Sequence, residues 1–288
     1  TIDALSQAWV DGQSLRTYRH APNAGPRKSW AAGDATSRAL QLVLFTQKGQ
    51  IGYPSVLTAP TWGFYDVQFK GEQFSLPREF SSYVMENVLF KISFPAEFHA
   101  QTSVEAAVIL HEEIKDRIDE IETVEITTHE SAIRIISKEG ALNNPADRDH
   151  CIQYMTAIGL LKGDLVAEDY EDDVASDSRI DELRNKMVIK EDERYTKEYL
   201  EEDKRSIANA IVIHFKDGSS TEKVEVEYPI GHRRRREQGI PLLIEKFKAN
   251  LSTQFSENRT KEILSLCEDQ STLENSSVID FMNLMIAE

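Results

Sequence analysis

The 288-residue chain is long enough for one large domain or two smaller ones, and its 40% hydrophobic content is sufficient for a buried core. Its net charge of -16 gives an acidic surface that repels nucleic acid and anionic membranes, so we expect neither as a partner. No apolar run reaches the roughly 18 to 20 residues that a membrane-spanning helix needs. We therefore expect a globular protein without a membrane segment.

The two cysteines, Cys151 and Cys267, lie far apart in the sequence. So few cysteines favour a reducing compartment and exclude a disulfide framework. An iron-sulfur site needs several clustered thiolates, which two distant cysteines cannot supply. The sequence also contains no phosphate loop, dinucleotide fingerprint, Gly-x-Ser-x-Gly elbow or His-Glu-x-x-His motif. We therefore expect no iron-sulfur cluster and no metal site.

The first part of the chain predicts helices joined by loops. Apolar residues recur at helical spacing at Leu5, Ala8 and Trp9, and again over residues 30–45. The first helix is amphipathic and needs something to pack against, so we expect the chain to be cut from a longer protein. Residues 49–78 are rich in Gly, Pro and aromatic residues, which predicts an ordered loop whose aromatic side chains are buried.

Residues 93–128 predict a helix followed by a strand. Ser93 and Pro95 signal the start of a helix that continues to about Lys115. Apolar and polar residues then alternate over residues 124–128, which indicates a half-buried strand.

Residues 145–228 predict further helices and a hairpin. Pro145 opens a helix that continues through residue 161 and ends near Gly163, and residues 178–187 form another helix. Residues 210–215 and 224–228 are strands, and the turn residues between them make this the clearest hairpin in the sequence.

Everything from residue 240 onward predicts amphipathic helices. Helices first and scattered strands later indicate an α+β fold: part of an all-helical domain followed by an α+β domain with a small antiparallel sheet. We assign residues 1–75 to the helical domain and residues 76–240 to the α+β domain. Residues 241–288 are expected to be helices that pack back on the helical part.

Basic side chains gather where the long helix predicted over residues 30–45 begins, among them Arg19, Arg27 and Lys28. Exposed amide groups and the positive end of the helix dipole make this a candidate anion site. The alternative is a solvated basic loop on a negative protein.

His150 and Tyr154 lie four residues apart in the predicted helix that Pro145 opens, and therefore on one face. A Tyr and a His side by side can hold a carboxylate and pass a proton. The alternative is a buried Tyr with a local partner and a His that caps a loop. The same two interpretations apply to His99.

His232 precedes the run Arg233-Arg234-Arg235-Arg236, a strong basic cluster in an acidic chain. The cluster has three interpretations: binding the carboxylates of a substrate, binding the acidic surface of another subunit, or exposure to solvent.

Six long blocks of the sequence resemble the MmgE/PrpD family. They are RKSWAAGDATSR (27–38), GYPS (52–55), WGFYD (62–66), KISFPAEFH (91–99), NPADRDHCIQY (144–154) and YPIGH (228–232). The resemblance runs nearly from end to end. It implies a helical N-terminal domain, an α+β C-terminal domain, an active site between them, a homodimer and no cofactor.

The resemblance also implies site residues. In the family, a Lys at the start of the long helix, a Lys-x-x-Phe-Pro stretch with a following His, and the Tyr of a His-x-x-Gln-Tyr block face the substrate. The implied catalytic residues are His99, Tyr154 and Lys28. The implied substrate-binding residues are Lys91, His150, Arg148, His232 and Arg19.

The implied reaction is elimination of water from 2-methylcitrate, a small tricarboxylate of propionate catabolism. The family's other acid and base residues lie in a region without a counterpart in this chain, so the chain alone is expected to lack full activity. The alternatives are a lyase resembling cis-aconitate decarboxylase and a non-catalytic dimerisation fragment. The expected location is the cytoplasm, or the mitochondrial matrix of a eukaryote.

Overall fold

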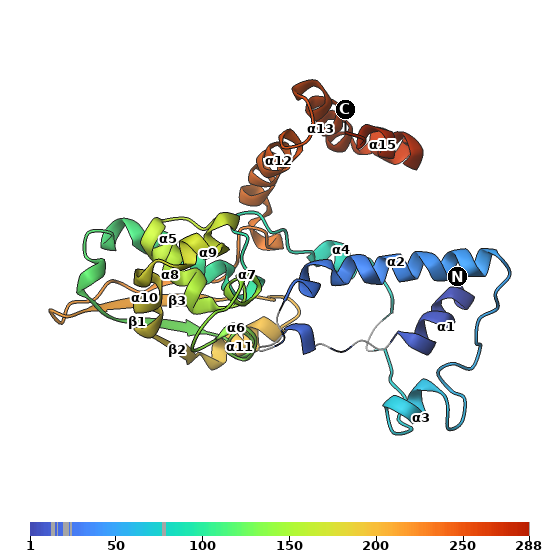
Figure 1. Ribbon diagram of the computed structural model, residues 1–288, viewed down its shortest axis with the longest axis horizontal. Coiled ribbons are helices and arrows are strands. Elements are labelled where there is room, and N and C mark those ends of the chain that lie inside the picture. Colours follow the sequence, from blue (N-terminus) through green and yellow to red (C-terminus); the bar gives the residue numbers. More distant parts are fainter. Residues whose placement is uncertain (13–14, 16, 20–22, 24, 77–78, 288) are drawn as a thin grey trace. The chain divides into compact units, whose positions relative to one another are not determined.

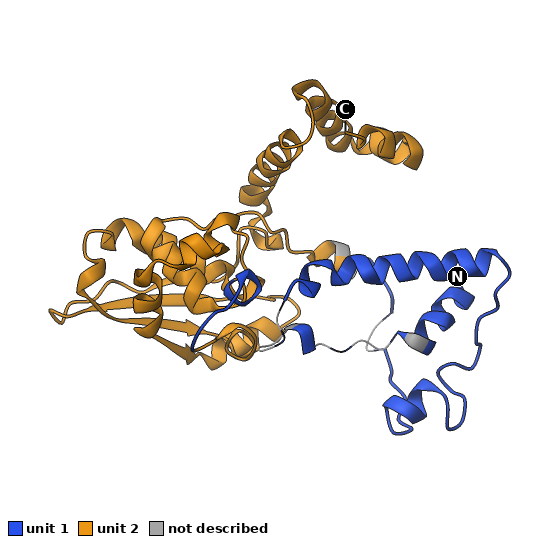
Figure 2. Ribbon diagram, in the orientation of Figure 1, with its two compact units in different colours: residues 1–82, 140–148 blue, residues 83–139, 149–288 orange. Residues whose placement is uncertain are grey.

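The computed structural model describes residues 1–288 apart from 13–14, 16, 20–22, 24, 77–78 and 288. The chain divides into two compact units, which Figure 2 shows in blue and orange. Unit 1 comprises residues 1–82 and 140–148, and unit 2 comprises residues 83–139 and 149–288. The domain boundaries at residues 75 and 240, and the packing of residues 241–288 on the helical part, stay predictions.

Unit 1 consists of helices and loops. Its helices are α1 Ile2–Asp11, α2 Arg27–Gln47, α3 Phe64–Gln68 and α7 Pro145–Arg148, with a 3-10 turn at Thr17–Arg19. The 21-residue α2 confirms the helix predicted over residues 30–45. Helix α1 packs against α2 (Figure 1), and the Gln7 side chain joins them by donating to the Thr46 hydroxyl over 3.3 Å.

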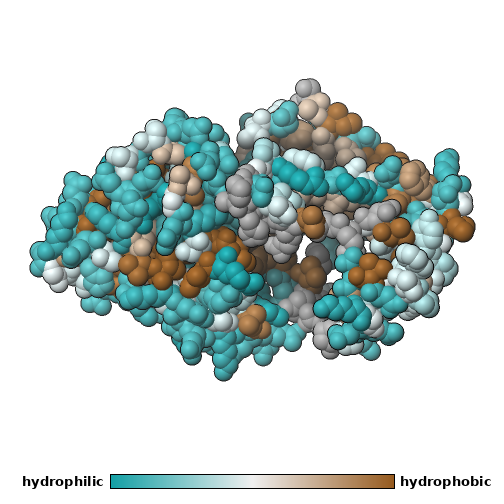
Figure 3. All heavy atoms as spheres, turned by 60° about the horizontal axis from the view of Figure 1, so that its bottom comes forward, coloured by the Kyte–Doolittle hydropathy of each residue, from teal (hydrophilic) through white to brown (hydrophobic). Residues whose placement is uncertain are grey.

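The aromatic side chains of unit 1 cluster with one another. The Trp9 ring lies 4.5 Å from that of Phe64, edge to face, and Phe64 lies 5.1 Å from Phe69. Phe69 nevertheless stays 44% exposed and Trp62 85% exposed, so the expectation that these aromatics are buried is wrong. The rings thus cover one another only in part. Figure 3 shows further hydrophobic residues, in brown, at the molecular surface.

Unit 2 is built around a four-stranded sheet with the strand order β2-β1-β3-β4. The strands are β1 Ile121–Thr128, β2 Met187–Glu191, β3 Asn209–Phe215 and β4 Val224–Val226. The strand predicted at residues 124–128, the hairpin and the α+β fold are confirmed. The purely antiparallel sheet is wrong, because β1 and β2 run parallel. This parallel pair is possible because a long helical crossover separates the two strands in sequence.

The remaining elements of unit 2 before residue 236 are short helices and turns. The helices are α4 Tyr83–Asn87, α5 Gln101–Ile114, α6 Glu130–Ile136, α8 Ile152–Lys162, α9 Asp172–Ala175, α10 Ser178–Asn185 and α11 Glu193–Leu200. The 3-10 turns are Phe98–Ala100, Ile118–Glu120, Ala167–Tyr170 and Arg233–Arg235.

Helices α5 and α8 form the core of unit 2 with the sheet. Helix α5 packs on β3 and β4, and α8 packs on α5. Nine of the eleven residues of α8 are buried. A Cβ at Gly159 would lie 2.9 Å from that of Ala107, so the close approach of the two helices requires glycine there. The buried hydroxyls of Ser103 and Thr156 join the helices over 2.8 Å.

Two predicted helices differ in the structure. The helix expected from Ser93 begins later, at α5, because the Glu97 side chain accepts the backbone N–H of His99 and holds a 3-10 turn before it. The helix expected from Pro145 is broken between α7 and α8, where Cys151 is extended with φ -126 and ψ 108. His150 therefore lies between two helices and shares no helical face with Tyr154.

The end of the chain is helical, as predicted. Its helices are α12 Arg236–Ser252, α13 Glu257–Glu268, α14 Gln270–Asn275 and α15 Val278–Leu284. Within the described ranges, no helix is long and apolar enough to cross a membrane.

Candidate active site

Unit 2 contains a cavity of about 570 Å³ that both apolar and titratable side chains line. Leu89, Phe98, Leu200 and Ile207 supply part of its apolar wall. The side chains in its wall that can carry a charge or a proton come from three segments of the chain. They are His99, Tyr199, Arg205 and His232. Of the residues predicted for the site, His99 and His232 thus lie at one cavity.

His99 is held by a carboxylate two residues before it. Its ring Nδ1 lies 2.8 Å from Glu97 Oε2, and its backbone N–H donates to the same oxygen over 2.8 Å. His99 is only 9% exposed. Burial raises the pKa of Glu97, but the hydrogen bonds and charge of His99 outweigh it and lower that pKa below its usual 4.5.

The ionised Glu97 determines which ring nitrogen of His99 carries the proton. A carboxylate only accepts hydrogen bonds, so Nδ1 of the neutral ring carries the hydrogen and Nε2 carries the lone pair. Nε2 lies 3.2 Å from the Tyr199 hydroxyl, which donates to it. Burial, with the Glu97 charge, raises the pKa of Tyr199, so this hydroxyl keeps its proton. This arrangement leaves a basic nitrogen at the cavity.

A second histidine packs behind His99. The His129 ring stacks on Tyr199 at 4.6 Å and lies 5.1 Å from the His99 ring. Its Nδ1 accepts the backbone N–H of Ala132 and so caps α6. Burial, together with the His99 charge, lowers the pKa of His129 to about 4. His129 is therefore neutral near pH 7, and it holds Tyr199 in place through ring stacking.

The backbone of His99 is attached to the sheet. The Asn209 side chain, at the start of β3, donates to the His99 carbonyl over 2.8 Å and to the Thr102 hydroxyl over 2.7 Å. The Thr102 hydroxyl in turn donates to the Ile207 carbonyl. These buried bonds keep His99 at one position relative to the cavity.

His232 has one ring nitrogen in a local hydrogen bond. Nδ1 accepts the backbone N–H of Arg234 over 3.1 Å. Burial, with the charges of Arg233 and Arg234, lowers the pKa of His232 to about 4. His232 is thus a neutral part of the wall at pH 7.

The arginines after His232 form hydrogen bonds or ion pairs within the chain. Arg233 and Arg234 donate to the Asp203 carbonyl over 2.6 and 2.8 Å. Arg235 forms a two-bond ion pair with Glu105, both N to O distances being 2.9 Å. These bonds fix the loop before β3. The interpretation that the arginines are merely exposed to solvent therefore does not describe this cluster.

His150 and Tyr154 lie in unit 2 but in different surroundings. His150 Nδ1 lies 2.8 Å from Asp149, and the charge of His150 contributes to the lowered pKa of Glu97, after the larger effects of burial and His99. The Tyr154 hydroxyl donates to the Asp169 carbonyl over 2.6 Å, and Tyr154 is 2% exposed. Its proton has a local acceptor in this structure.

The predicted cations are distributed over both units. Lys28 is the second residue of α2 in unit 1, and Arg148 is buried at the end of α7 in the same unit. Arg19 ends the turn Thr17–Arg19, and its side chain lies outside the described atoms. Lys91 lies in unit 2 with its ammonium nitrogen 5.2 Å from the centre of the Phe98 ring.

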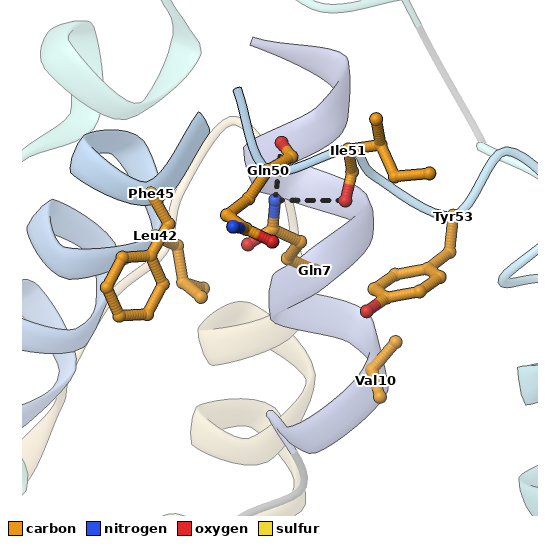
Figure 4. A pocket seen from close by; sticks show the side chains of 7 residues that line it. All are labelled: Gln7, Val10, Leu42, Phe45, Gln50, Ile51 and Tyr53. Carbon is orange, nitrogen blue, oxygen red and sulfur yellow. Dashed lines mark hydrogen bonds between the residues drawn. The ribbon is translucent and has the colours of Figure 1, made fainter. Parts of the chain in front are cut away.

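Unit 1 has a hollow of its own, of about 390 Å³, which Figure 4 shows from close by. Gln7 points into it and donates to the carbonyls of Gln50 and Ile51 over 3.5 and 3.4 Å. Val10, Leu42, Phe45 and Tyr53 complete its lining. Its described lining includes no Lys, Arg or His, so these residues offer no cation for a carboxylate.

Both cysteines belong to unit 2, where Cys151 is buried and Cys267 half-buried, and neither forms a disulfide. In the part of the chain that the structure describes, no three His, Cys, Asp or Glu side chains are grouped so as to hold a metal ion.

Four residues of the site were not singled out from the sequence: Glu97, His129, Tyr199 and Arg205. The spacing Glu97-x-His99 is a signal that could have found the first, because a carboxylate near a histidine often orients its ring. The other three come from segments that only the folded sheet brings to His99.

The fold and the site define a protein suited to acid-base chemistry, in which a carboxylate orients the central histidine. Residues 94–270 match the MmgE/PrpD C-terminal domain, and residues 1–77 match the MmgE/PrpD N-terminal domain. The chain belongs to the MmgE/PrpD family.

Individual relatives are named 2-methylcitrate dehydratase or 2-methylcitrate dehydratase-like protein. The chain is 60% identical over 288 residues to the 2-methylcitrate dehydratase of Escherichia coli K12, covering 99% of this chain and 60% of that protein. It is 57% identical over 289 residues to the mitochondrial 2-methylcitrate dehydratase of Yarrowia lipolytica, covering 99% and 55%. It is 44% identical over 291 residues to a 2-methylcitrate dehydratase-like protein of Aspergillus oryzae, covering 99% and 58%. The chain therefore spans little more than half the length of these relatives.

Proposed function

We propose that this chain is part of a 2-methylcitrate dehydratase, a hydro-lyase that converts 2-methylcitrate to 2-methyl-cis-aconitate in propionate catabolism. The observation that carries the proposal is His99, whose Nδ1 is bound by Glu97 and whose Nε2 is at the cavity. The names of the relatives, at 60% and 57% identity, supply the substrate. The activity is that of the whole protein.

The reaction needs a base, an acid and cations. A base removes a proton from the carbon beside a carboxylate, the electron pair of the C–H bond forms the C=C bond, and the C–O bond breaks. The leaving hydroxide takes a proton from an acid and departs as water. Negative charge develops on the carboxylate beside the reacting carbon, and cations that contact it lower the barrier.

The residues of unit 2 fit the role of the base. His99 Nε2 takes the proton, and the imidazolium that forms is stabilised by the ionised Glu97 at Nδ1. Tyr199 donates to Nε2 in the free enzyme, and its hydroxyl turns away from Nε2 when the substrate's C–H bond takes that place.

Other groups of the site follow from the family resemblance. Lys28 and Lys91 hold substrate carboxylates, and Tyr154 takes part in the proton transfer. The further substrate-binding residues are Arg148, His150, His232 and Arg19. The enzyme works without an iron-sulfur cluster or another cofactor, as a homodimer. Its location is the cytoplasm, or the mitochondrial matrix in a eukaryote.

The experiment that tests the proposal is an assay of the full-length protein with 2-methylcitrate. The conjugated alkene of the product absorbs in the ultraviolet, so its appearance measures dehydration directly. Dehydration without carbon dioxide release supports the proposal. Release of carbon dioxide from cis-aconitate supports the decarboxylase alternative, and no turnover of either acid contradicts both lyases.

The same assay on residues 1–288 alone addresses the third candidate, a dimerisation fragment. Measurable dehydration by this piece excludes a purely non-catalytic role. If the piece is inactive while the full-length protein turns over, the missing segment supplies groups that the reaction needs.

A further inference from the structure

Arg205 is a cation without a partner at the wall of the His99 cavity. Within the described residues, its guanidinium forms no hydrogen bond or ion pair, and its Nε is buried without a partner. The chain has 49 acidic and 33 basic side chains, so acidic partners for its arginines are in excess. Arg235, for example, is paired with Glu105 through two bonds of 2.9 Å. Burying a guanidinium nitrogen without a partner is costly, and this half-buried side chain lines a cavity.

The backbone holds Arg205 in an unusual conformation. Its φ is 48°, in the left-handed region that non-glycine residues rarely adopt because of steric strain. The surrounding contacts maintain this conformation. The Arg205 N–H donates to the Glu201 carbonyl over 2.9 Å, and the Arg233 guanidinium donates to the Asp203 carbonyl over 2.6 Å. The loop is therefore fixed from both sides.

Arg205 lies close to the reacting groups. Burial is the main influence on the Tyr199 hydroxyl and raises its pKa, and the nearby Arg205 charge acts in the opposite direction. That hydroxyl lies 3.2 Å from His99 Nε2. Arg205, Tyr199 and His99 line the same cavity, so an anion bound to Arg205 there shares the cavity with the base.

We propose that Arg205 binds one carboxylate of the substrate and thereby presents the neighbouring C–H bond to His99 Nε2. Its planar guanidinium can donate two parallel hydrogen bonds to a carboxylate, which fixes the orientation of that group as well as its position. The inference rests on the proposed function, because it takes the cavity of unit 2 as the place where the tricarboxylate binds. It adds a cation from unit 2 to those that the family resemblance implies.

The test uses two variants of the full-length protein and a matched control. Arg205→Gln removes the charge, and Arg205→Lys keeps the charge but loses the paired donors. The control is Arg179→Gln, since Arg179 is an exposed arginine whose partner is Asp177, outside the cavity. Two quantities are measured: binding of tricarballylate, a tricarboxylate without a leaving hydroxyl, by calorimetry, and steady-state kinetics with 2-methylcitrate.

We expect Arg205→Gln to weaken tricarballylate binding by roughly 10- to 150-fold, the loss of hydrogen bonds to a charged group. It should also raise KM and lower kcat, because the C–H bond is no longer aligned with His99. Arg205→Lys should bind between the wild type and Arg205→Gln but keep the low kcat. Arg179→Gln should match the wild type in both measurements.

Tricarballylate binding by Arg205→Gln within twofold of the wild type overturns the proposal, and so does a wild-type protein that does not bind this acid. If Arg205→Gln fails to fold, Arg205→Lys serves as the test. The proposal is then overturned if Arg205→Lys binds tricarballylate and turns over 2-methylcitrate as the wild type does. A wild type that binds tricarballylate through Arg205 but does not dehydrate 2-methylcitrate refutes the proposed function alone.

Discussion

Helix α2 of unit 1 and helix α8 of unit 2 bury their side chains very differently. None of the 21 residues of α2 is buried, and Leu40 stays 60% exposed and Phe45 45% exposed. In α8, nine of eleven residues are buried. Unit 2 thus forms a close-packed core from this chain alone, whereas the apolar residues of unit 1 lack cover within it.

The difference bears on chemistry. A base needs a fixed position and a dry environment, and unit 2 supplies both for His99 through Glu97, Asn209 and the buried core. Unit 1 contributes the predicted cation Lys28 from a helix whose side chains are exposed or half-buried. We therefore expect changes in unit 2 to have the larger effects on both catalysis and stability.

The largest effect is expected from His99→Asn, which removes the proposed base. The kcat of the full-length protein for 2-methylcitrate should fall by about 10² to 10⁴, the usual contribution of a general base. His214→Asn is the control, since His214 lies on β3 of the same unit with an exposed side chain. A His99→Asn enzyme that keeps wild-type kcat contradicts the placing of the chemistry in unit 2.

The next effect concerns stability. Leu110→Ala in α5, where Leu110 is 1% exposed, should lower the free energy of unfolding by about 2 to 5 kcal/mol, because it leaves a cavity. Leu40→Ala in α2 makes the same chemical change at a 60% exposed side chain and should cost less than about 1 kcal/mol. Urea unfolding of both variants measures the difference. Equal losses would show that α2 is packed in the whole protein.

A third effect is the loss of stability in acid. The folded-state pKa of His129 is about 4 and its ordinary value is 6.5, so below pH 6.5 the unfolded state binds a proton that the folded state excludes. The contribution of the neutral ring to the free energy of unfolding is therefore fully present above pH 6.5. It falls by about 1.4 kcal/mol per pH unit as the pH drops towards 4. His129→Asn, which can still cap α6, should flatten this slope in unfolding curves at pH 4 to 7. An unchanged slope would contradict a neutral buried His129.

The smallest effect is expected from Tyr199→Phe. It removes the hydroxyl that donates to His99 Nε2 but keeps the ring that stacks on His129. The loss of one hydrogen bond should lower kcat/KM by about 3- to 10-fold. Tyr53→Phe makes the same change at the hollow of unit 1, and steady-state kinetics should not detect it. Equal effects of the two variants would remove the functional distinction between the two cavities.

Much of the fold could be predicted, because its signals are local. The period of apolar residues predicted α2, β1 and the β3–β4 hairpin, and Gly163 ended α8 as expected, in the left-handed conformation with φ 71°. The break before α8 has no local signal, since the extended Cys151 is buried and contacts the Lys138 carbonyl through tertiary packing. The strand β2 was missed because it is five residues long and only partly buried.

The site could be predicted only in part. His99 was found through the block of residues 91–99, and its carboxylate partner lies in the same block. His129, Tyr199 and Arg205 lie 30 to 106 residues further along the chain, and only β1 and β3 bring their segments together at His99. No periodicity or motif connects such distant positions.

The most direct test is a structure of the full-length protein crystallised with tricarballylate. We predict that the acid occupies the cavity of unit 2, with one carboxylate hydrogen-bonded to Arg205 and the adjacent carbon next to His99 Nε2. Tricarballylate bound elsewhere, with this cavity closed or filled by protein side chains, would contradict the assignment of the reaction to His99.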